Sequence, residues 1–336
     1  QNASDSPQDI KIELFQAGSS TATATTTFTD VPVNASLEVN LGSVGDFAAF
    51  NGKYGAAKIT GLQDGPLAAV ISYERDMGTG TAAMTNGEYH GIDPDLAAKT
   101  WYAPVVYKNH NGWATGINIL NTESVTTTVT VTYTASAQSA YAGTVVTDSL
   151  VLGPNAMGSF YMPSNSDLPA SGFYGGALIT SDVADILIIV NSTNYSASGG
   201  AVAAGYEAIS ASEATSKISA PLIFRGHADT NSGINVQNVG TQATTITLTV
   251  AKNPSSTPTG TGVPGPWTFT RTNVPAGGAV TFYLPASDLL GGVSRLYGSA
   301  VIQSSNDQPL VAVITSASYP RGISANYVGI NYGQVD

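Results

Sequence analysis

Apolar and polar residues alternate along much of this chain. Every second residue is apolar in Ile10-Lys11-Ile12-Glu13-Leu14, and Ile246-Thr247-Leu248-Thr249-Val250 repeats the alternation with Thr on the polar side. A period of two places successive side chains on opposite faces of a strand, and β-branched residues suit such a half-buried surface. Turn signals such as Gly153-Pro154-Asn155 separate the runs at intervals of roughly ten residues. The pattern therefore predicts an all-β fold of short antiparallel strands.

Continuous apolar runs mark the strands expected at the centre of the core. They occur three times, as Leu67 to Ile71, Leu187 to Val190 and Leu310 to Ile314. A strand that is buried on both faces needs no polar alternation. Short strands with frequent turns predict antiparallel β-sandwiches of the immunoglobulin-like kind, with about seven strands in each.

The chain repeats itself internally. The pairs Tyr54-Gly55, Tyr174-Gly175 and Tyr297-Gly298 introduce similar strings, separated by 120 and 123 residues. That period is too long for a solenoid, whose repeats span about 20–50 residues. Each repeat is long enough to bury its own core. We therefore expect three tandem units, at residues 1–97, 98–217 and 218–336.

The first unit lacks its opening strands. The second unit opens with Ala103 to Asn121 and the third with Ala220 to Asn238, whereas Gln1-Asn2 aligns with Gln237-Asn238 at the end of that segment. The sequence predicts an incomplete sandwich whose missing strands come from a neighbouring chain. A cleaved upstream piece or a longer array would also supply them.

Composition restricts the partners. Charged residues make up 10% of the chain, the net charge is −11 and the isoelectric point is about 4.5. An acidic, charge-poor protein offers no basic face for nucleic acid or anionic membranes. Without Cys there is no disulfide, thiolate nucleophile or Cys-based zinc site. No apolar run reaches the ~18–20 residues of a membrane-spanning helix. We expect an extracellular or cell-surface protein that needs no cofactor.

The residues that could carry chemistry are few. His110 and His227 occupy equivalent loop positions, whereas His90 has no counterpart. Two histidines in separate units cannot share one metal ion, so each is expected to bond to its own backbone. No recognisable nucleophile or phosphate-binding motif is present. The sequence predicts that the protein is not an enzyme.

Three recurring acidic residues have a structural interpretation. Asp46, Asp167 and Asp288 follow the same strand in each unit. A short acidic side chain at such a place usually closes a turn or caps a helix. Calcium would require several clustered oxygen ligands, and no such run exists. We expect no metal site here.

The sequence predicts different roles for aromatic residues that recur in the units and for those that do not. Tyr54, Tyr174 and Tyr297 recur, and we expect their rings to be largely buried with hydrogen-bonded hydroxyls. Trp113 and Trp267 do not recur, so they are candidates for ligand or interface contacts. Four sequons provide candidate glycosylation sites, at Asn2, Asn34, Asn191 and Asn194.

The tandem units, Thr-rich strands and sparse charge resemble the immunoglobulin-like repeats of bacterial surface and fibre proteins. The truncated first unit is similar to the incomplete sandwiches of donor-strand pili. The resemblance implies a structural subunit that forms a homopolymer, head to tail, as a filament or surface layer. The alternative is an adhesin or carbohydrate-binding array that acts as a stalk, with glycans or a host surface as partner. The expected interface residues are Ile10, Ile12, Leu14, Leu67 and Val70 on one side, and Tyr319, Tyr327 and Tyr332 on the other.

Overall fold

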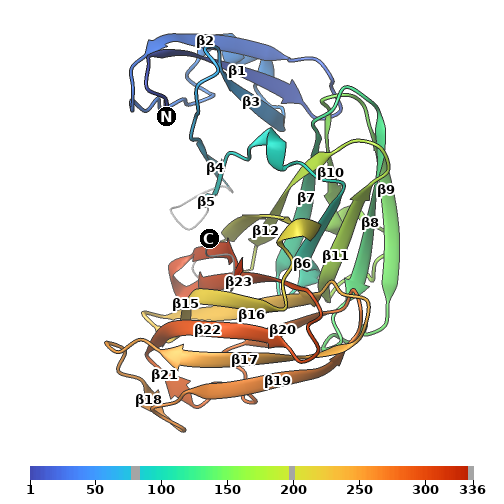
Figure 1. The fold of residues 1–336 in the computed structure, drawn as a ribbon, viewed down its shortest axis with the longest axis vertical. Coiled ribbons are helices and arrows are strands. Elements are labelled where there is room, and N and C mark those ends of the chain that lie inside the picture. The colour runs from blue at the N-terminus through green and yellow to red at the C-terminus, as the bar shows by residue number, and fades with distance from the viewer. Residues whose placement is uncertain (77–83, 197–200, 332–336) are drawn as a thin grey trace.

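The computed structural model describes residues 1–76, 84–196 and 201–331, and nearly all its regular structure is antiparallel strand (Figure 1). The predicted all-β fold is confirmed. The alternation is visible in the burial of β8, where buried and half-buried residues follow one another from Thr127 to Ala135. No helix in these described ranges is long and apolar enough to span a bilayer.

The second unit is a β-sandwich with nine strands. They follow the order β13-β12-β7-β6-β11-β8-β9, with β10 added to β7 and β14 added to β6. The path folds over at the β6–β7 hairpin, so that the inner faces of the two sheets share one apolar core. The strands are β6 (Thr100–His110), β7 (Trp113–Asn121), β8 (Thr127–Ala135), β9 (Val145–Leu152), β10 (Met157–Tyr161), β11 (Phe173–Ser181), β12 (Ile186–Asn194), β13 (Val202–Glu207) and β14 (Ile209–Ser210).

The third unit has the same strand order. Its path runs β24-β23-β16-β15-β22-β17-β19, with β20 on β16 and β25 on β15, and a small β18–β21 ribbon is added. Apart from β18 and β21, each strand thus has an equivalent in the second unit, beginning with β15 for β6. The strands are β15 (Lys217–His227), β16 (Thr230–Asn238), β17 (Thr244–Lys252), β18 (Thr259–Gly260), β19 (Trp267–Val274), β20 (Ala279–Tyr283), β21 (Val293–Ser294), β22 (Leu296–Ser304), β23 (Leu310–Ser318), β24 (Ile323–Val328) and β25 (Ile330–Asn331).

The first unit contains part of this arrangement. Its sheet order β2-β1-β3 matches β9-β8-β11, and its β4–β5 hairpin matches β12–β13. Among the described residues no strand takes the places of β6, β7 and β10. The strands are β1 (Gln8–Gln16), β2 (Ala24–Val31), β3 (Gly55–Gly61), β4 (Val70–Asp76) and β5 (Met84–His90). Short 3-10 turns complete the fold: η1 (Gly45–Phe50), η3 (Pro94–Leu96), η4 (Met162–Ser164), η5 (Ala211–Glu213) and η6 (Tyr319–Arg321).

A buried asparagine fixes the same turn in all three units. The side chains of Asn2, Asn121 and Asn238 are fully buried, and each Nδ2 donates to three carbonyl oxygens. The acceptors are Ser6, Val31 and Pro32 for Asn2; Val125, Leu152 and Gly153 for Asn121; and Gln242, Val274 and Pro275 for Asn238. The alignment of Gln1-Asn2 with Gln237-Asn238 therefore holds in three dimensions.

The units follow a curve (Figure 1). The first-unit sheet lies at the top of the view, the second unit at the right and the third at the bottom. The β4–β5 hairpin is separated from the rest of its unit and lies against the second unit, where β5 contacts β13. Strand β13 in turn contacts β24 of the third unit. The sheet of the first unit is also attached to the second, because the Gly18 N–H donates to the Met157 carbonyl at 2.8 Å.

The recurring tyrosines are not the buried residues that the sequence predicts. Tyr174 and Tyr297 are half-buried and Tyr54 is exposed, whereas the preceding residues Phe173 and Leu296 are fully buried. Strand alternation places a residue and its neighbour on opposite faces, and the tyrosine falls on the outer one. The prediction of a buried tyrosine ring was therefore wrong, and the buried residue is the one before Tyr174 and Tyr297.

The glycine after each tyrosine is required by a close approach of backbones. A Cβ at Gly175 would lie 2.0 Å from the Thr134 carbonyl oxygen, and one at Gly298 would lie 2.1 Å from that of Ala251. At Gly55 the distance to the Phe15 oxygen would be 1.8 Å. Real Cβ atoms do not approach oxygen so closely, so the recurring Gly keeps β3, β11 and β22 against their neighbours.

We expect Gly175→Ala to destabilise the second unit by about 2–4 kcal/mol, because the strand must move away from β8. Gly153→Ala is the matched control, since a Cβ at Gly153 would meet nothing within 4 Å. Urea unfolding of both variants measures the difference. Equal midpoints for the two variants would contradict this account of the repeat.

Candidate functional site

A groove lies between the second and third units. Its volume is about 630 Å³, and aromatic and amide side chains form most of its lining. The second unit contributes the β6–β7 turn and the start of β11, and the third contributes β16, β20 and the end of β23. Residues far apart in the sequence thus share one concave surface.

Hydrogen bonds across the joint, which is the contact between the second and third units, hold the two walls of the groove in place. Trp113 Nε1 donates to Tyr319 Oη at 3.2 Å, and the Thr281 N–H donates to Gln138 Oε1 at 2.6 Å. Outside the groove, Ser324 Oγ donates to the Ala203 carbonyl at 2.9 Å. Because these bonds connect the units directly, the groove is formed before any ligand arrives.

Stacked rings form the second-unit wall. The His110 ring lies 4.3 Å from that of Tyr174 and 6.2 Å from that of Tyr107, which packs beside Trp113 at 5.8 Å. His110 Nδ1 is 3.1 Å from the Gly172 carbonyl. Burial lowers the pKa of His110, although the bond to Gly172 opposes the shift. The imidazole is therefore neutral at pH 7.

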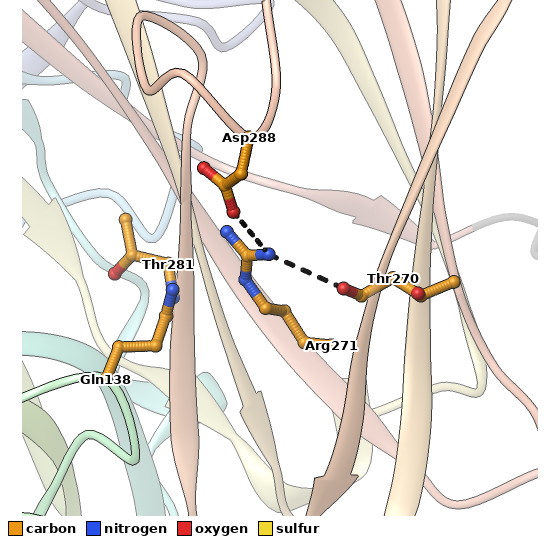
Figure 2. Close-up of polar contacts among 5 residues, drawn as sticks. All are labelled: Gln138, Thr270, Arg271, Thr281 and Asp288. Atoms are coloured by element: carbon orange, nitrogen blue, oxygen red, sulfur yellow. Dashed lines mark hydrogen bonds and ion pairs between the residues drawn. The ribbon is translucent and has the colours of Figure 1, made fainter.

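An ion pair lies in the third-unit wall. Arg271 Nη1 is 2.9 Å from Asp288 Oδ2, and Figure 2 shows the guanidinium between that carboxylate and the Thr270 carbonyl. The stem of Arg271 packs on the core side of β19, with its guanidinium carbon 5.1 Å from the centre of the Phe282 ring. The pairing leaves this wall without net charge.

Strand β20 forms the third-unit rim. Thr281 Oγ1 donates to Asn235 Oδ1 at 2.9 Å, and the exposed Tyr283 ring projects from the end of the strand. Burial is the main cause of a raised pKa at both Tyr283 and Tyr174. Both hydroxyls keep their protons at neutral pH and can donate hydrogen bonds.

The groove has the composition of a binding site. It combines flat aromatic surfaces with a few convergent polar groups, as ligand sites usually do. Within the described ranges, no three His, Cys, Asp or Glu side chains are grouped so that they could hold a metal ion. Arg271 and Asp288 neutralise each other, which leaves hydrogen bonding and stacking as the interactions that this surface offers.

A second unusual feature is the exposure of core positions in the first unit. Ile59 is 37% exposed, whereas its equivalents Ile179 and Ile302 are fully buried. Ile71 is half-buried, although Val190 is fully buried at the same place in the second unit. The residues suit a sandwich core, but the strands that would cover them are absent from the described residues.

The outer faces at the two ends show the same contrast. In the joint between the second and third units, Val313 is fully buried on the outer face of β23, whereas its equivalent Val70 on β4 is 71% exposed. On the opposing face Ile209 is buried, whereas its equivalent Ile330 is 57% exposed. Among the described residues, equivalents of side chains that are buried in the joint between the second and third units are thus exposed in the first unit and in the third.

The structure places the first set of predicted interface residues differently from the prediction. Ile10, Ile12 and Leu14 are buried, and Phe47 of η1 belongs to the same buried cluster as Ile12 and Leu14. The prediction that these three side chains lie open at a sheet edge is therefore wrong. Leu67 is half-buried, and the exposed member of the set is Val70.

The second predicted set consists of Tyr319, Tyr327 and Tyr332, and the two that the structure describes lie in different places. Tyr319 lies in the groove, bonded to Trp113. Tyr327 Oη donates to the Leu222 carbonyl within the third unit, and Tyr332 lies outside the described residues. Trp267 packs against the third core and is not among the groove residues.

The remaining histidine and acidic candidates have structural contacts. The His227 ring lies 4.7 Å from that of Tyr297, which repeats the His110 stack. His90 Nε2 is 2.9 Å from Glu207 Oε1, so it links β5 to β13; burial raises the pKa of Glu207, and His90 opposes the shift. The Asp46 carboxylate accepts a hydrogen bond from Thr26 at 2.7 Å.

Burial separates the four sequons. Asn2 and Asn194 are buried, and each donates its Nδ2 to backbone carbonyls, so the folded chain leaves no room for a glycan there. Asn191 is half-buried within β12, whereas Asn34 is exposed.

The sequence did not predict three of the residues that line the groove, Gln138, Arg271 and Tyr283. Gln138 and Tyr283 carry no local motif. The sequence does contain a signal for Arg271. Trp267, Phe269 and Arg271 occupy the inward positions of an alternating strand, and a charged residue is unusual at such a position. Its partner Asp288 was assigned to a turn, and the ion pair depends on the packing of β19 beside that turn.

We expect the His110 imidazole to titrate below the usual value of about 6.5. As the pH falls, the unfolded chain takes up this proton before the folded one, so the free energy of unfolding should decrease below pH 6.5 and be unaffected above it. Proton NMR, with the His110 signal assigned through His110→Gln, measures the midpoint. A midpoint at or above that of the urea-unfolded chain would contradict the burial argument.

Comparisons with known proteins give little similarity. No protein-family model matches the chain, and no curated protein sequence matches it. The crystal structure of Thermotoga maritima 1070 is 13% identical over 34% of this chain and 94% of its own, with a TM-score of 0.29. A tetra-tandem repeat from the extending region of a large adhesion protein is 13% identical over 98% of this chain and 68% of its own, with a TM-score of 0.15. Similarity at this level identifies neither a family nor a function.

Proposed function

We propose that this chain is a non-enzymatic structural subunit that acts outside the cell and assembles head to tail into a filament or surface layer. In this proposal the three units are immunoglobulin-like sandwiches. The first unit is completed by strands of a neighbouring copy, and the third unit of one copy packs on the first unit of the next. The observation that carries the proposal is that Val70 and Ile330 are exposed, whereas their equivalents Val313 and Ile209 are buried in the joint between the second and third units.

The internal joint shows how one unit covers another. Val311 and Val313, on the outer face of β23, belong to the same buried cluster as Val105 and Ile209 of the second unit. Strand β23 contacts β6 directly. Burying a side chain of this kind contributes about 1.5–3 kcal/mol. The joint is therefore an apolar contact that a similar pair of faces can repeat.

The ends carry the matching halves of that joint. Leu222 is 45% exposed in the third unit, whereas its equivalent Val105 is almost completely buried. Together with Ile330 it forms the tail face, and Val70 marks the head face of the first unit. A contact between tail and head uses two different surfaces, so it need not close and can propagate as a filament.

Strand addition would complete the first unit. Strand β11 pairs with β8 on one side and β6 on the other, whereas the described chain pairs β3 with β1 alone. Unpaired N–H and C=O groups at such an edge are a template for an added strand. A strand pair equivalent to β6–β7 would also cover Ile59, so hydrogen bonding and apolar burial favour the same occupant.

Composition supports a place outside the cell. The chain has few charges, many Thr-rich strands and no cysteine. A protein of this kind does not depend on a reducing compartment, and the proposed assembly would provide the stability that disulfides give to many exported proteins.

Two charge substitutions test the assembly. Val70→Asp should block the head face and Ile330→Asp the tail face, because each places an unpaired carboxylate in an apolar contact. We expect each variant to weaken self-association at least about tenfold, which corresponds to about 1.4 kcal/mol. Light scattering after size exclusion gives the masses. Val151→Asp is the matched control, since Val151 is 64% exposed on β9, away from both faces.

Mixing the two variants makes the test directional. Val70→Asp keeps an intact tail face, and Ile330→Asp keeps an intact head face. An equimolar mixture should therefore form dimers, and these should not grow, because both of their remaining faces are blocked. Continued growth of the mixture, or a wild-type chain that stays monomeric at high concentration, would contradict head-to-tail assembly.

A second candidate function is a stalk that binds glycans. The specific observation in its favour is the groove between the second and third units, where aromatic rings and amides gather around a neutral ion pair. This function would not require the two end faces.

A further inference from the structure

We infer that the groove between the second and third units binds a neutral oligosaccharide. The inference rests on the second candidate function and not on assembly. It specifies a site, a ligand class and the residue on which binding depends most, Tyr283.

Tyr283 is an exposed aromatic residue that lines the groove. Its side chain is 44% exposed and lies across Gly233, where a Cβ would be 3.8 Å from the ring. Because Gly233 has no side chain, the Tyr283 ring has room above it, and a large part of the tyrosine stays accessible to a ligand. The C–H-bearing face of a pyranose ring packs on such a surface, as apolar groups generally do on aromatic rings.

The opposite wall offers a second ring surface. Tyr174 and His110 are half-buried, their rings pack against each other at an interplanar angle of 40°, and both line the groove. Two aromatic surfaces on facing walls suit a ligand with alternating apolar faces and polar edges. A sugar chain has this character, whereas an apolar ligand would leave the amides of the groove unpaired.

Polar groups lie where the hydroxyl edges of a sugar would be. Asn111 and Gln138 come from the second unit, and Asn231 and Asp288 from the third. A side-chain amide presents a donor beside an acceptor, and a carboxylate presents two acceptors, so both match vicinal hydroxyl groups. The Asp288 side chain is largely solvent-accessible even though it pairs with Arg271, so its oxygens can accept further hydrogen bonds.

The charge of the groove favours a neutral ligand. Arg271 and Asp288 form an ion pair, and the lowered pKa of His110 keeps its ring uncharged at pH 7. An anionic glycan would meet no unpaired cation among the lining residues. The volume lies within the range of about 300–1,000 Å³ that is usual for ligand sites, which is enough for a short oligosaccharide.

Calorimetry with four neutral tetrasaccharides tests the inference: cellotetraose, maltotetraose, mannotetraose and tetra-N-acetylchitotetraose. We expect at least one to bind and to change the fluorescence of Trp113, which lies in the groove. Tyr283→Ala should weaken that binding at least about tenfold, and Tyr283→Trp should restore it, because the indole supplies the same flat face.

The second unit offers a matched control for this substitution. Tyr161 ends β10 as Tyr283 ends β20, is 47% exposed and lies across Gly116, but it is outside the groove. Tyr161→Ala should bind the same probe as the wild type does. Equal losses in the two alanine variants, or no binding of any of the four probes, would overturn the inference.

The assembly variants separate this inference from the proposed filament. Val70→Asp leaves the groove intact, so it should bind the probe with unchanged affinity whether or not it assembles. Loss of probe binding in Val70→Asp would overturn the assignment to this groove, since that residue lies in the first unit.

Discussion

Burial of apolar side chains between two facing sheets is the interaction on which this structure depends. In the second and third units both sheets are present, and isoleucines such as Ile179 and Ile302 are fully buried. In the first unit the sequence of the strand is similar, yet Ile59 is partly exposed, because no described strand faces it or pairs with the free edge of β3. The same residue is thus a core residue or a surface residue according to whether its sandwich is complete. This difference is the reason for proposing that a neighbouring chain adds strands to the first unit.

The same requirement explains the contacts between units. Where β23 meets β6, valines are buried and the joint resembles a core. Beside that contact the surface between the units is polar and aromatic, and direct hydrogen bonds cross it from Trp113 to Tyr319 and from the Thr281 N–H to Gln138. The apolar joint fixes the orientation of the two units, and this orientation in turn shapes the groove. One contact therefore supports both the assembly and the binding site that we propose.

Much of the fold could be predicted from the sequence. Alternation identified the strands, and the repeat aligned Asn2 with Asn121 and Asn238, whose buried side chains make equivalent hydrogen bonds. The tyrosine expectation failed, because a recurring Tyr-Gly pair does not reveal which of two adjacent residues faces inward. The groove could not be predicted, since the bond between Trp113 and Tyr319 depends on how two units are oriented. Ile10, Ile12 and Leu14 were assigned to an interface because the covering turn η1 has no periodic signal.

Hydrogen exchange of the β3 amides tests the central claim most directly. In the separated subunit, the amides of residues 55–61 that point away from β1 should exchange much faster than those of β11 and β22, which have partners on both sides. In assembled material their protection should rise to the level of the equivalent strands, while β11 and β22 remain unchanged. If β3 is already as protected as β11 in the separated subunit, or gains no protection on assembly, the first unit is not completed by a neighbouring chain.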